Sequence, residues 1–382
     1  MKKLFVLLAF LLAILSLGII LSMNSGNVEV EELHESNKEL KFKETPRLAE
    51  ANSKVLMAYI QDFRDPGMVD YSMVTHVIFS FAHPTKEGTL MFNGETAMNN
   101  LRTMVSKAHE QNTKAILAVG GWYHIEGGES YEYFKVAISN PNTRTKLVRE
   151  LVHVAKQEKL DGIDIDFEHP RSDEDAHNLA VFTEMLSDEI HAINKELSIA
   201  VYSKINSVTG TEMNYVVFDT TMFQHVDHVN IMAYDGQWDG GYNAANLSPY
   251  PFTKKIVDYW SKLFDSNGIS KKKLVLGVPF YAQPENQASK QVSYAAIVDN
   301  NPKNATRDTV HMHGTTYHYN GTLTMQRKTK LALDNGFGGM MLWEAGHDAQ
   351  GKYSLALAIS NELQKPGNEQ EKQYTLNTQD KK

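Results

Sequence analysis

The sequence predicts an α/β protein built as a (β/α)₈ TIM barrel, with at most a short insertion between the seventh and eighth strands. The first observation is that short apolar runs rich in β-forming residues recur eight times along the chain. The second is that segments with the apolar period of an amphipathic helix separate most of these runs. This alternation is typical of a closed parallel barrel. No glycine-rich nucleotide fingerprint follows the first run, which disfavours a doubly wound open sheet.

Eight runs are the predicted barrel strands. They are Lys54–Ile60, Thr75–Ala82, Lys114–Gly121, Asp161–Glu168, Leu197–Ser203, Val226–Tyr234, Lys273–Tyr281 and Gly336–Trp343. The helical period is clearest in residues 98–112, 142–159, 176–196 and 323–335. Because function gathers at the carboxyl ends of barrel strands, the residues that end these runs are the first candidates for a site.

The two ends of the chain differ in composition from the part between them. Lys2 and Lys3 precede an uncharged apolar run, residues 4–21, as in an export signal. The run approaches the roughly 20 residues that span a bilayer, so a cleaved signal peptide and a retained membrane anchor both stay open. Either alternative places the barrel outside the cell, secreted or tethered to the outer face of the cell membrane. The predicted parts are 1–23 (signal peptide or anchor), 24–52 (disordered polar stalk), 53–364 (barrel) and 365–382 (disordered polar tail).

The composition disfavours several classes of function. The net charge is −8 and no basic cluster is present, so no nucleic-acid partner is expected. The chain has no cysteine, which excludes disulfides, thiolate metal sites and a cysteine nucleophile. His311 and His313 could bind a metal, but no third ligand accompanies them, so surface histidines are expected. We therefore predict no cofactor and no metal site, and a monomeric protein.

The fourth predicted strand lies in an unusual sequence, LDGIDIDFEHP, at residues 160–170. Because side chains alternate along a strand, Asp164, Asp166 and Glu168 share one face and apolar residues share the other. The apolar face is expected to pack under the helices, while the acidic face points into the barrel and Glu168 reaches the rim. Asp161 is out of phase with the other acids, and a turn or capping role is expected for it.

Three carboxylates this close cannot all ionise at low cost, because repulsion and desolvation raise the pKa of at least one. A carboxylic acid that stays protonated near neutral pH is what general acid catalysis requires. Metal binding is a rival function, since hard cations bind carboxylates, but an extended strand holds its carboxylates in a line. A solvated acidic face is the remaining alternative, and an internal barrel strand has no solvated face.

These residues resemble glycoside hydrolase family 18, the chitinase family, whose signature DGxDxDxE matches Asp161–Glu168. Ala118–Trp122 is similar to the family's SxGG motif, with alanine in place of serine. Met232–Asp235 is similar to its MxYD motif, and Trp343 stands where the family keeps the tryptophan under the sugar. The four motifs occur in the expected order on the third, fourth, sixth and eighth strands. The resemblance covers roughly Lys54–Leu363.

The resemblance implies substrate-assisted hydrolysis, with the substrate's own 2-acetamido carbonyl as the nucleophile. It implies that Glu168 is the acid and then the base, and that Asp166 holds the acetamido N–H. It implies that Asp164 shares a proton with Asp166, and that the Tyr234 hydroxyl donates to the acetamido oxygen.

The resemblance also suggests residues that bind the sugar. Trp343 would supply an apolar face for the ring, and Asp235 would contact the same sugar. Simple core packing is the alternative for the other candidates, which lie at strand ends. They are Tyr59, Phe81, Gly121, Trp122, Met232 and Tyr281.

The function expected from this resemblance is hydrolysis of β-1,4-linked N-acetylglucosamine polymers, either chitin or chitooligosaccharides. An N-acetylglucosaminidase acting on peptidoglycan or on N-glycan cores would use the same catalytic residues, so these substrates remain open. A non-catalytic sugar-binding lectin is a third alternative, disfavoured because Glu168 is intact. The sequence departs from the family pattern at His169, where tyrosine is common, and lacks the arginine often found near the end of the seventh strand.

Overall fold

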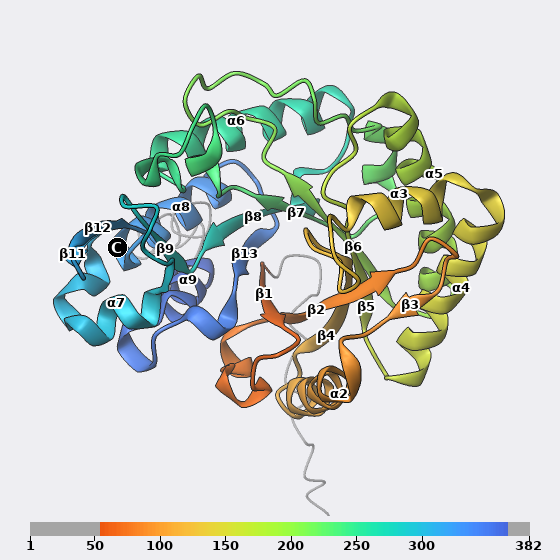
Figure 1. Ribbon diagram of the computed structural model, residues 1–382, viewed down its shortest axis with the longest axis horizontal. Helices are drawn as coiled ribbons and strands as arrows, with labels where there is room; N and C mark the ends of the chain where they lie inside the picture. The colour runs from red at the N-terminus through yellow and green to blue at the C-terminus, as the bar shows by residue number, and fades with distance from the viewer. Residues whose placement is uncertain (1–53, 366–382) are drawn as a thin grey trace, which may run out of the picture. The chain divides into compact units, whose positions relative to one another are not determined.

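Eight parallel strands close on themselves in the computed structural model, which describes residues 54–365 (Figure 1). The strand order is β1-β13-β8-β7-β6-β5-β4-β2, and β2 pairs back with β1. This confirms the predicted barrel. The predicted signal or anchor at 1–23, the stalk at 24–52 and the tail beyond residue 365 lie outside the described residues and stay predictions.

Each barrel strand coincides with one of the eight predicted runs. The strands are β1 (Val55–Gln61), β2 (His76–Pro84), β4 (Lys114–Gly120), β5 (Gly162–Asp166), β6 (Glu196–Tyr202), β7 (His228–Met232), β8 (Leu274–Pro279) and β13 (Gly339–Trp343). A two-residue strand, β3 (Leu90–Met91), extends β2 as an antiparallel edge. One boundary matters for function, because β5 ends at Asp166 and Glu168 therefore lies just beyond the strand.

Helices surround the barrel (Figure 1). They are α2 (Gly94–Glu110), α3 (Tyr131–Ser139), α4 (Pro141–Gln157), α5 (Asp173–His191), α6 (Tyr250–Ser266), α7 (Tyr294–Asn300), α8 (Thr322–Asp334) and α9 (Leu355–Leu363). The four segments with the clearest predicted period are α2, α4, α5 and α8. In the part of the chain between residues 54 and 365, no helix is both long and apolar enough to cross a bilayer.

The predicted short insertion between the last two barrel strands is a small antiparallel sheet with one short helix, α7. Its strands, in the order β10-β9-β12-β11, are β9 (Tyr281–Pro284), β10 (Val292–Ser293), β11 (Thr309–Met312) and β12 (Thr315–His318). His311 and His313 are exposed at this sheet, which confirms that they are surface histidines.

The two faces of β5 pack as the alternating sequence predicts. Ile163 and Ile165 are fully buried on the helix side of the strand. Phe167 stacks on Tyr131 of α3, with ring centroids 5.5 Å apart, and tilts against Phe134 of the same helix. Burial of these apolar side chains outside the barrel turns the acidic side chains inward, because alternate residues of a strand point to opposite faces.

Candidate active site

The acidic side chains of β5 rise through the centre of the barrel. Asp164 is 0% exposed and Asp166 is 3% exposed, whereas Glu168 is partly exposed at the rim. The glycine pair that ends β4 allows a close approach to this strand. A Cβ on Gly120 would lie only 2.0 Å from the Asp166 carbonyl oxygen, and the Gly121 N–H donates to that oxygen at 2.9 Å. The backbone below Glu168 is therefore fixed by β4.

Asp164 is anchored from three other strands. Its Oδ2 accepts from the Tyr59 hydroxyl at 2.8 Å, and its Oδ1 accepts from Ser198 Oγ at 2.5 Å and Asn230 Nδ2 at 3.1 Å. Burial raises the pKa of Asp164 to about 6, although the three hydrogen bonds act to lower it. No sequence motif indicated Ser198 or Asn230. Both are polar residues at inward positions of apolar strands, which is the signal that could have found them.

Asp166 and Glu168 have far less support. Asp166 Oδ1 is buried and has no hydrogen-bond partner among residues 54–365, and no hydrogen bond joins it to Asp164 there. Burial, followed by the charges of Glu168 and Asp164, holds the pKa of Asp166 well above its ordinary value. Burial and then the charge of Asp235 raise the pKa of Glu168 to about 7. Burial and the neighbouring charges therefore favour the protonated form of Asp166, and Glu168 titrates near neutral pH.

The end of β7 carries a second polar group. Asp235 has left-handed backbone torsion, with φ at 62°, and its Oδ1 accepts from the Tyr281 hydroxyl at 2.5 Å and from Gln237 Nε2 at 3.0 Å. Tyr234 is buried beside it, and its hydroxyl contacts only the Met341 sulfur, at 3.8 Å, among the described residues. A contact to sulfur at that distance is weak, so the hydroxyl keeps its capacity to donate to a ligand.

A cavity of about 560 Å³ opens above these groups, within the size range of small-ligand sites. Eight of the predicted residues line it: Tyr59, Trp122, Asp166, Glu168, Met232, Tyr234, Asp235 and Trp343. The lining also includes Tyr123, Ala200, Tyr202, Trp238 and Met341, which the sequence analysis missed. Tyr202 ends β6, so the strand-end rule that selected Tyr59 could have found it too.

Three residues with a predicted role in substrate binding do not line this cavity, and each contacts a residue of the site or its support. Phe81 stacks on Trp343 with centroids 5.9 Å apart, so it lies behind the tryptophan. A Cβ on Gly121 would lie 2.7 Å from the Phe81 ring, so glycine is needed for that ring to fit. Tyr281 is 2% exposed and holds Asp235 from behind. Phe81, Gly121 and Tyr281 are therefore absent from the lining of this cavity, and their predicted contact with substrate stays a prediction.

Large aromatic side chains are exposed around the mouth of the cavity. Trp122 is 38% exposed, Tyr123 is 72% exposed and Trp238 is 61% exposed. Trp122 and Tyr123 follow β4, and Trp238 follows β7. Exposed aromatic rings grouped at one cavity favour a ligand with apolar faces and polar edges, because the rings bury apolar area when it binds.

The chain is similar in sequence to proteins of a known family. Residues 54–348 match the family model described as glycosyl hydrolases family 18. Endochitinase 1 of Metarhizium robertsii is 25% identical over 360 residues, which cover 79% of this chain and 82% of that protein.

Two solved structures have the same fold. One is the GH18 chitinase ChiB from the chitin utilization locus of Flavobacterium johnsoniae, with a TM-score of 0.67, 23% identity, and coverage of 82% of this chain and 94% of that one. The other is a chitinase-like agglutinin of Robinia pseudoacacia, with a TM-score of 0.67, 20% identity, and coverage of 80% and 99%. Both a chitinase and an agglutinin therefore use this barrel, and the side chains in the cavity must distinguish them.

Proposed function

The chain belongs to glycosyl hydrolases family 18 and is a glycoside hydrolase, and from this premise we propose that it is an exported enzyme that cleaves β-1,4-linked N-acetylglucosamine polymers, chitin or chitooligosaccharides. The observation that supports this most directly is the position of Glu168. Its carboxyl lines the cavity with a pKa raised to about 7, two residues beyond the buried Asp166, whose own pKa is held well above its ordinary value.

Glu168 acts first as the acid and then as the base. A carboxyl group with a pKa near the working pH can donate a proton to the glycosidic oxygen and later take one from water. Its rim position leaves the group accessible to a glycosidic bond bound in the cavity. The conservative change Glu168→Gln removes this proton donor without changing the size of the side chain.

Asp166 holds the acetamido group of the substrate. Its buried Oδ1 lacks a partner, and an acetamido N–H would supply one. The acetamido carbonyl then attacks the anomeric carbon, forming a bond as the bond to the leaving sugar breaks, and gives a cationic oxazolinium ring. That positive charge favours ionised Asp166. Asp164, which three donors hold in place, accepts the proton once a side-chain rotation of Asp166 brings the two carboxyl groups into hydrogen-bond contact. Water activated by Glu168 then opens the ring with retention.

Tyr234 and Trp343 position the same sugar. The Tyr234 hydroxyl donates to the acetamido oxygen, since its contact with Met341 leaves it available. Trp343 presents an apolar face to the sugar ring, held in place by Phe81 and Tyr59. Asp235, fixed by Tyr281, contacts a hydroxyl of this sugar and keeps the pKa of Glu168 high.

Matched oligosaccharides with and without the 2-acetamido group test the proposal. The full chain should cleave N-acetylglucosamine oligomers and leave glucose oligomers of equal length intact, as read by mass spectrometry of the products. Comparable rates on both would refute substrate assistance. Peptidoglycan and an N-glycan core, assayed in parallel, identify the substrate among the family alternatives. Binding of N-acetylglucosamine oligomers without any turnover would favour a lectin like the Robinia agglutinin.

The same cavity supports endo action on a polymer. No described residue of the insertion between β8 and β13 lines the cavity, so the insertion does not wall it in. A soluble chitin derivative should lose viscosity quickly and give oligomers of several sizes early. Disaccharide alone, released from the first minutes at unchanged viscosity, would contradict endo action.

Export is supported by the sequence alone, through Lys2, Lys3 and the uncharged run at residues 4–21. Amino-terminal sequencing of the mature protein from the native host distinguishes a cleaved signal from a retained anchor. An intact Met1 on protein in the cytoplasmic fraction would contradict both.

A further inference from the structure

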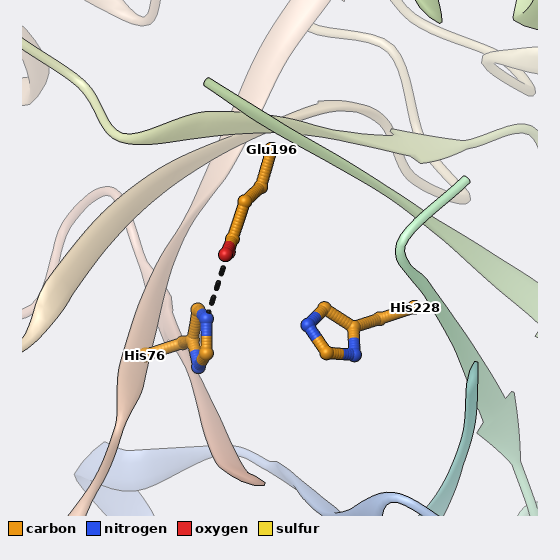
Figure 2. Close-up of side chains that lie close together, drawn as sticks. All are labelled: His76, Glu196 and His228. Atoms are coloured by element: carbon orange, nitrogen blue, oxygen red, sulfur yellow. Dashed lines mark hydrogen bonds and ion pairs between the residues drawn. The ribbon is translucent and has the colours of Figure 1, made fainter. Parts of the chain in front are cut away.

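The end of the barrel opposite the cavity contains a second cluster of titratable side chains. His76 begins β2, Glu196 begins β6 and His228 begins β7. One ligand atom from each lies within 4.8 Å of the other two. Figure 2 shows the hydrogen bond between His76 and Glu196, with a ring nitrogen of His228 facing this pair. Among residues 54–365, this is the one group of three such side chains with metal-binding spacing.

One ring nitrogen of His228 lacks a hydrogen-bond partner. Its Nδ1 is buried and has no hydrogen-bond partner in the described part of the chain. The ring lies edge-on to His76, with centroids 5.4 Å apart. A buried imidazole nitrogen without a hydrogen-bond partner destabilises the fold. A bound metal ion removes that cost at one ring nitrogen, and the other nitrogen can bond to water or to a neighbouring side chain.

The other two side chains are already oriented by neighbours. Thr75 Oγ1 lies 2.7 Å from His76 Nδ1, which leaves Nε2 facing Glu196 Oε2 at 2.9 Å. Lys114 Nζ donates to the other carboxylate oxygen of Glu196. Ligands in metal sites are held in this way, with the outer nitrogen or oxygen bonded to a second residue.

We propose that His76, Glu196 and His228 form a binding site for a divalent transition-metal ion, with Zn²⁺ as the best fit. Two imidazoles and one carboxylate are a common donor set for zinc, and no cysteine is required. The ion replaces the proton shared by His76 and Glu196, and water completes the coordination. Bonds of about 2.0–2.2 Å to one tetrahedral ion place its ligand atoms about 3.3–3.6 Å apart. His76 Nε2 and Glu196 Oε2 are 2.9 Å apart, so these two would separate slightly to admit the ion. The side chain of Glu196 is 28% exposed, so the site is open to solvent.

The consequence of this site is structural. The ion would join β2 to the adjacent pair β6 and β7, across the barrel interior, and none of the three ligands lines the substrate cavity. Zinc should therefore raise thermal stability without entering the reaction. No metal site was predicted from the sequence, because these residues are far apart in the chain and none belongs to a short ligand motif.

The test uses the full chain, freed of metal with a chelator and then titrated with zinc chloride. Wild type should bind one zinc ion per chain and unfold at a higher temperature. His228→Gln should weaken zinc binding by at least ~10-fold, the lower range for damage to a metal site. Glu196→Gln is the second variant if His228→Gln does not fold. Excess Mg²⁺ should not displace the zinc, because magnesium prefers oxygen ligands.

His109→Gln is the matched control. His109 pairs with Asp161 at 2.8 Å at the same end of the barrel but lies outside the cluster. Its zinc affinity should equal that of wild type. Wild type without stoichiometric zinc would overturn the proposal, as would equal affinities for wild type and His228→Gln. Unchanged hydrolysis by His228→Gln would show that the variant is folded and that the lost binding is local.

Discussion

The two ends of the barrel shift the pKa values of their carboxyl groups in opposite directions. At the cavity end, burial and neighbouring negative charge raise the pKa of Glu168 to about 7 and hold that of Asp166 well above its ordinary value. At the other end, burial acts to raise the pKa of Glu196, but His76 and Lys114 outweigh it and lower the pKa to about 2. The same strand barrel therefore contains acids that keep a proton and an acid that has lost one.

The difference lies in the partners that each carboxyl group has. Glu196 has two cationic or hydrogen-bonding partners, so its charge stabilises the fold. Asp166 lacks such a partner, so its ionisation would destabilise the fold. In the proposed reaction the cationic oxazolinium ring supplies the missing positive charge. Perturbed acids without partners are the usual mark of a reactive site, and paired acids are the usual mark of a structural one.

The largest expected effect separates the two ends by activity. Glu168→Gln removes the proton donor, and kcat should fall by at least ~10²–10⁴-fold while oligosaccharide binding is retained. Glu196→Gln makes the same chemical change at the other end and should keep kcat within about twofold, since it touches no cavity residue. Steady-state kinetics at pH 6 and binding by calorimetry give both values. Near-full turnover by Glu168→Gln would remove it from the acid role.

The next effect is a gain in stability from the inactivating change. In the unfolded chain Glu168 ionises near 4.5, but in the fold it stays protonated up to about 7, so wild-type stability falls as pH rises between these values. Glutamine does not titrate. At pH 7.5 the free energy of unfolding of Glu168→Gln should therefore be about 1–3 kcal/mol higher than that of wild type. Near pH 4 the two free energies of unfolding should be equal. Urea titration at both pH values measures this, and a gain that is the same at both would contradict the origin in pKa.

Glu196→Gln should change stability in the opposite direction. The folded-state pKa of Glu196 is about 2, below its ordinary 4.5, so its charge stabilises the fold above pH 4.5 and the contribution is lost as pH falls toward 2. Because the side chain is partly exposed, we expect a loss of only about 1–2 kcal/mol at pH 7. The loss should shrink by pH 3. Measurement in a chelator keeps metal binding out of the comparison, and a loss independent of pH would indicate a packing defect instead.

The sequence predicted the acidic end of the barrel well because its signal is local. The alternation in DGIDIDFE places Asp164, Asp166 and Glu168 on one face and Phe167 on the other, and the packing of Phe167 on α3 confirms it. The alternation of side chains along a strand could not by itself predict which side chains at the strand ends reach the cavity. Phe81 lies behind Trp343 because a glycine leaves room for its ring there, and such a fit depends on residues distant in sequence.

The opposite end was not predictable from any short motif. His76, Glu196 and His228 come from three strands, and Glu196 follows His76 by 120 positions. Each alone is an ordinary polar residue at the start of a strand. Only closure of the barrel brings them together, as it brings Ser198 and Asn230 to Asp164. The sequence is sufficient to predict which face of a strand a residue occupies, because that pattern repeats within the strand. It does not predict which side chains meet across the barrel, because that depends on the register between strands.

The smallest expected effect concerns how the cavity sets the pKa of its acid. In the proposed mechanism Glu168 must be protonated to act, so kcat/KM should fall on the alkaline side with an apparent pKa of about 7. Burial is the larger cause of that value and the charge of Asp235 the smaller. Asp235→Asn removes the charge, which lowers the pKa of Glu168 and moves the alkaline limb of the pH profile to lower pH by less than roughly one unit.

Glu196→Gln is the control, because it removes one negative charge at the far end and should leave the alkaline limb in place. The absolute rate of Asp235→Asn will also fall through lost substrate contact, but the position of the limb is independent of that loss. A limb that stays at the wild-type pH in Asp235→Asn would show that burial alone sets the pKa of Glu168.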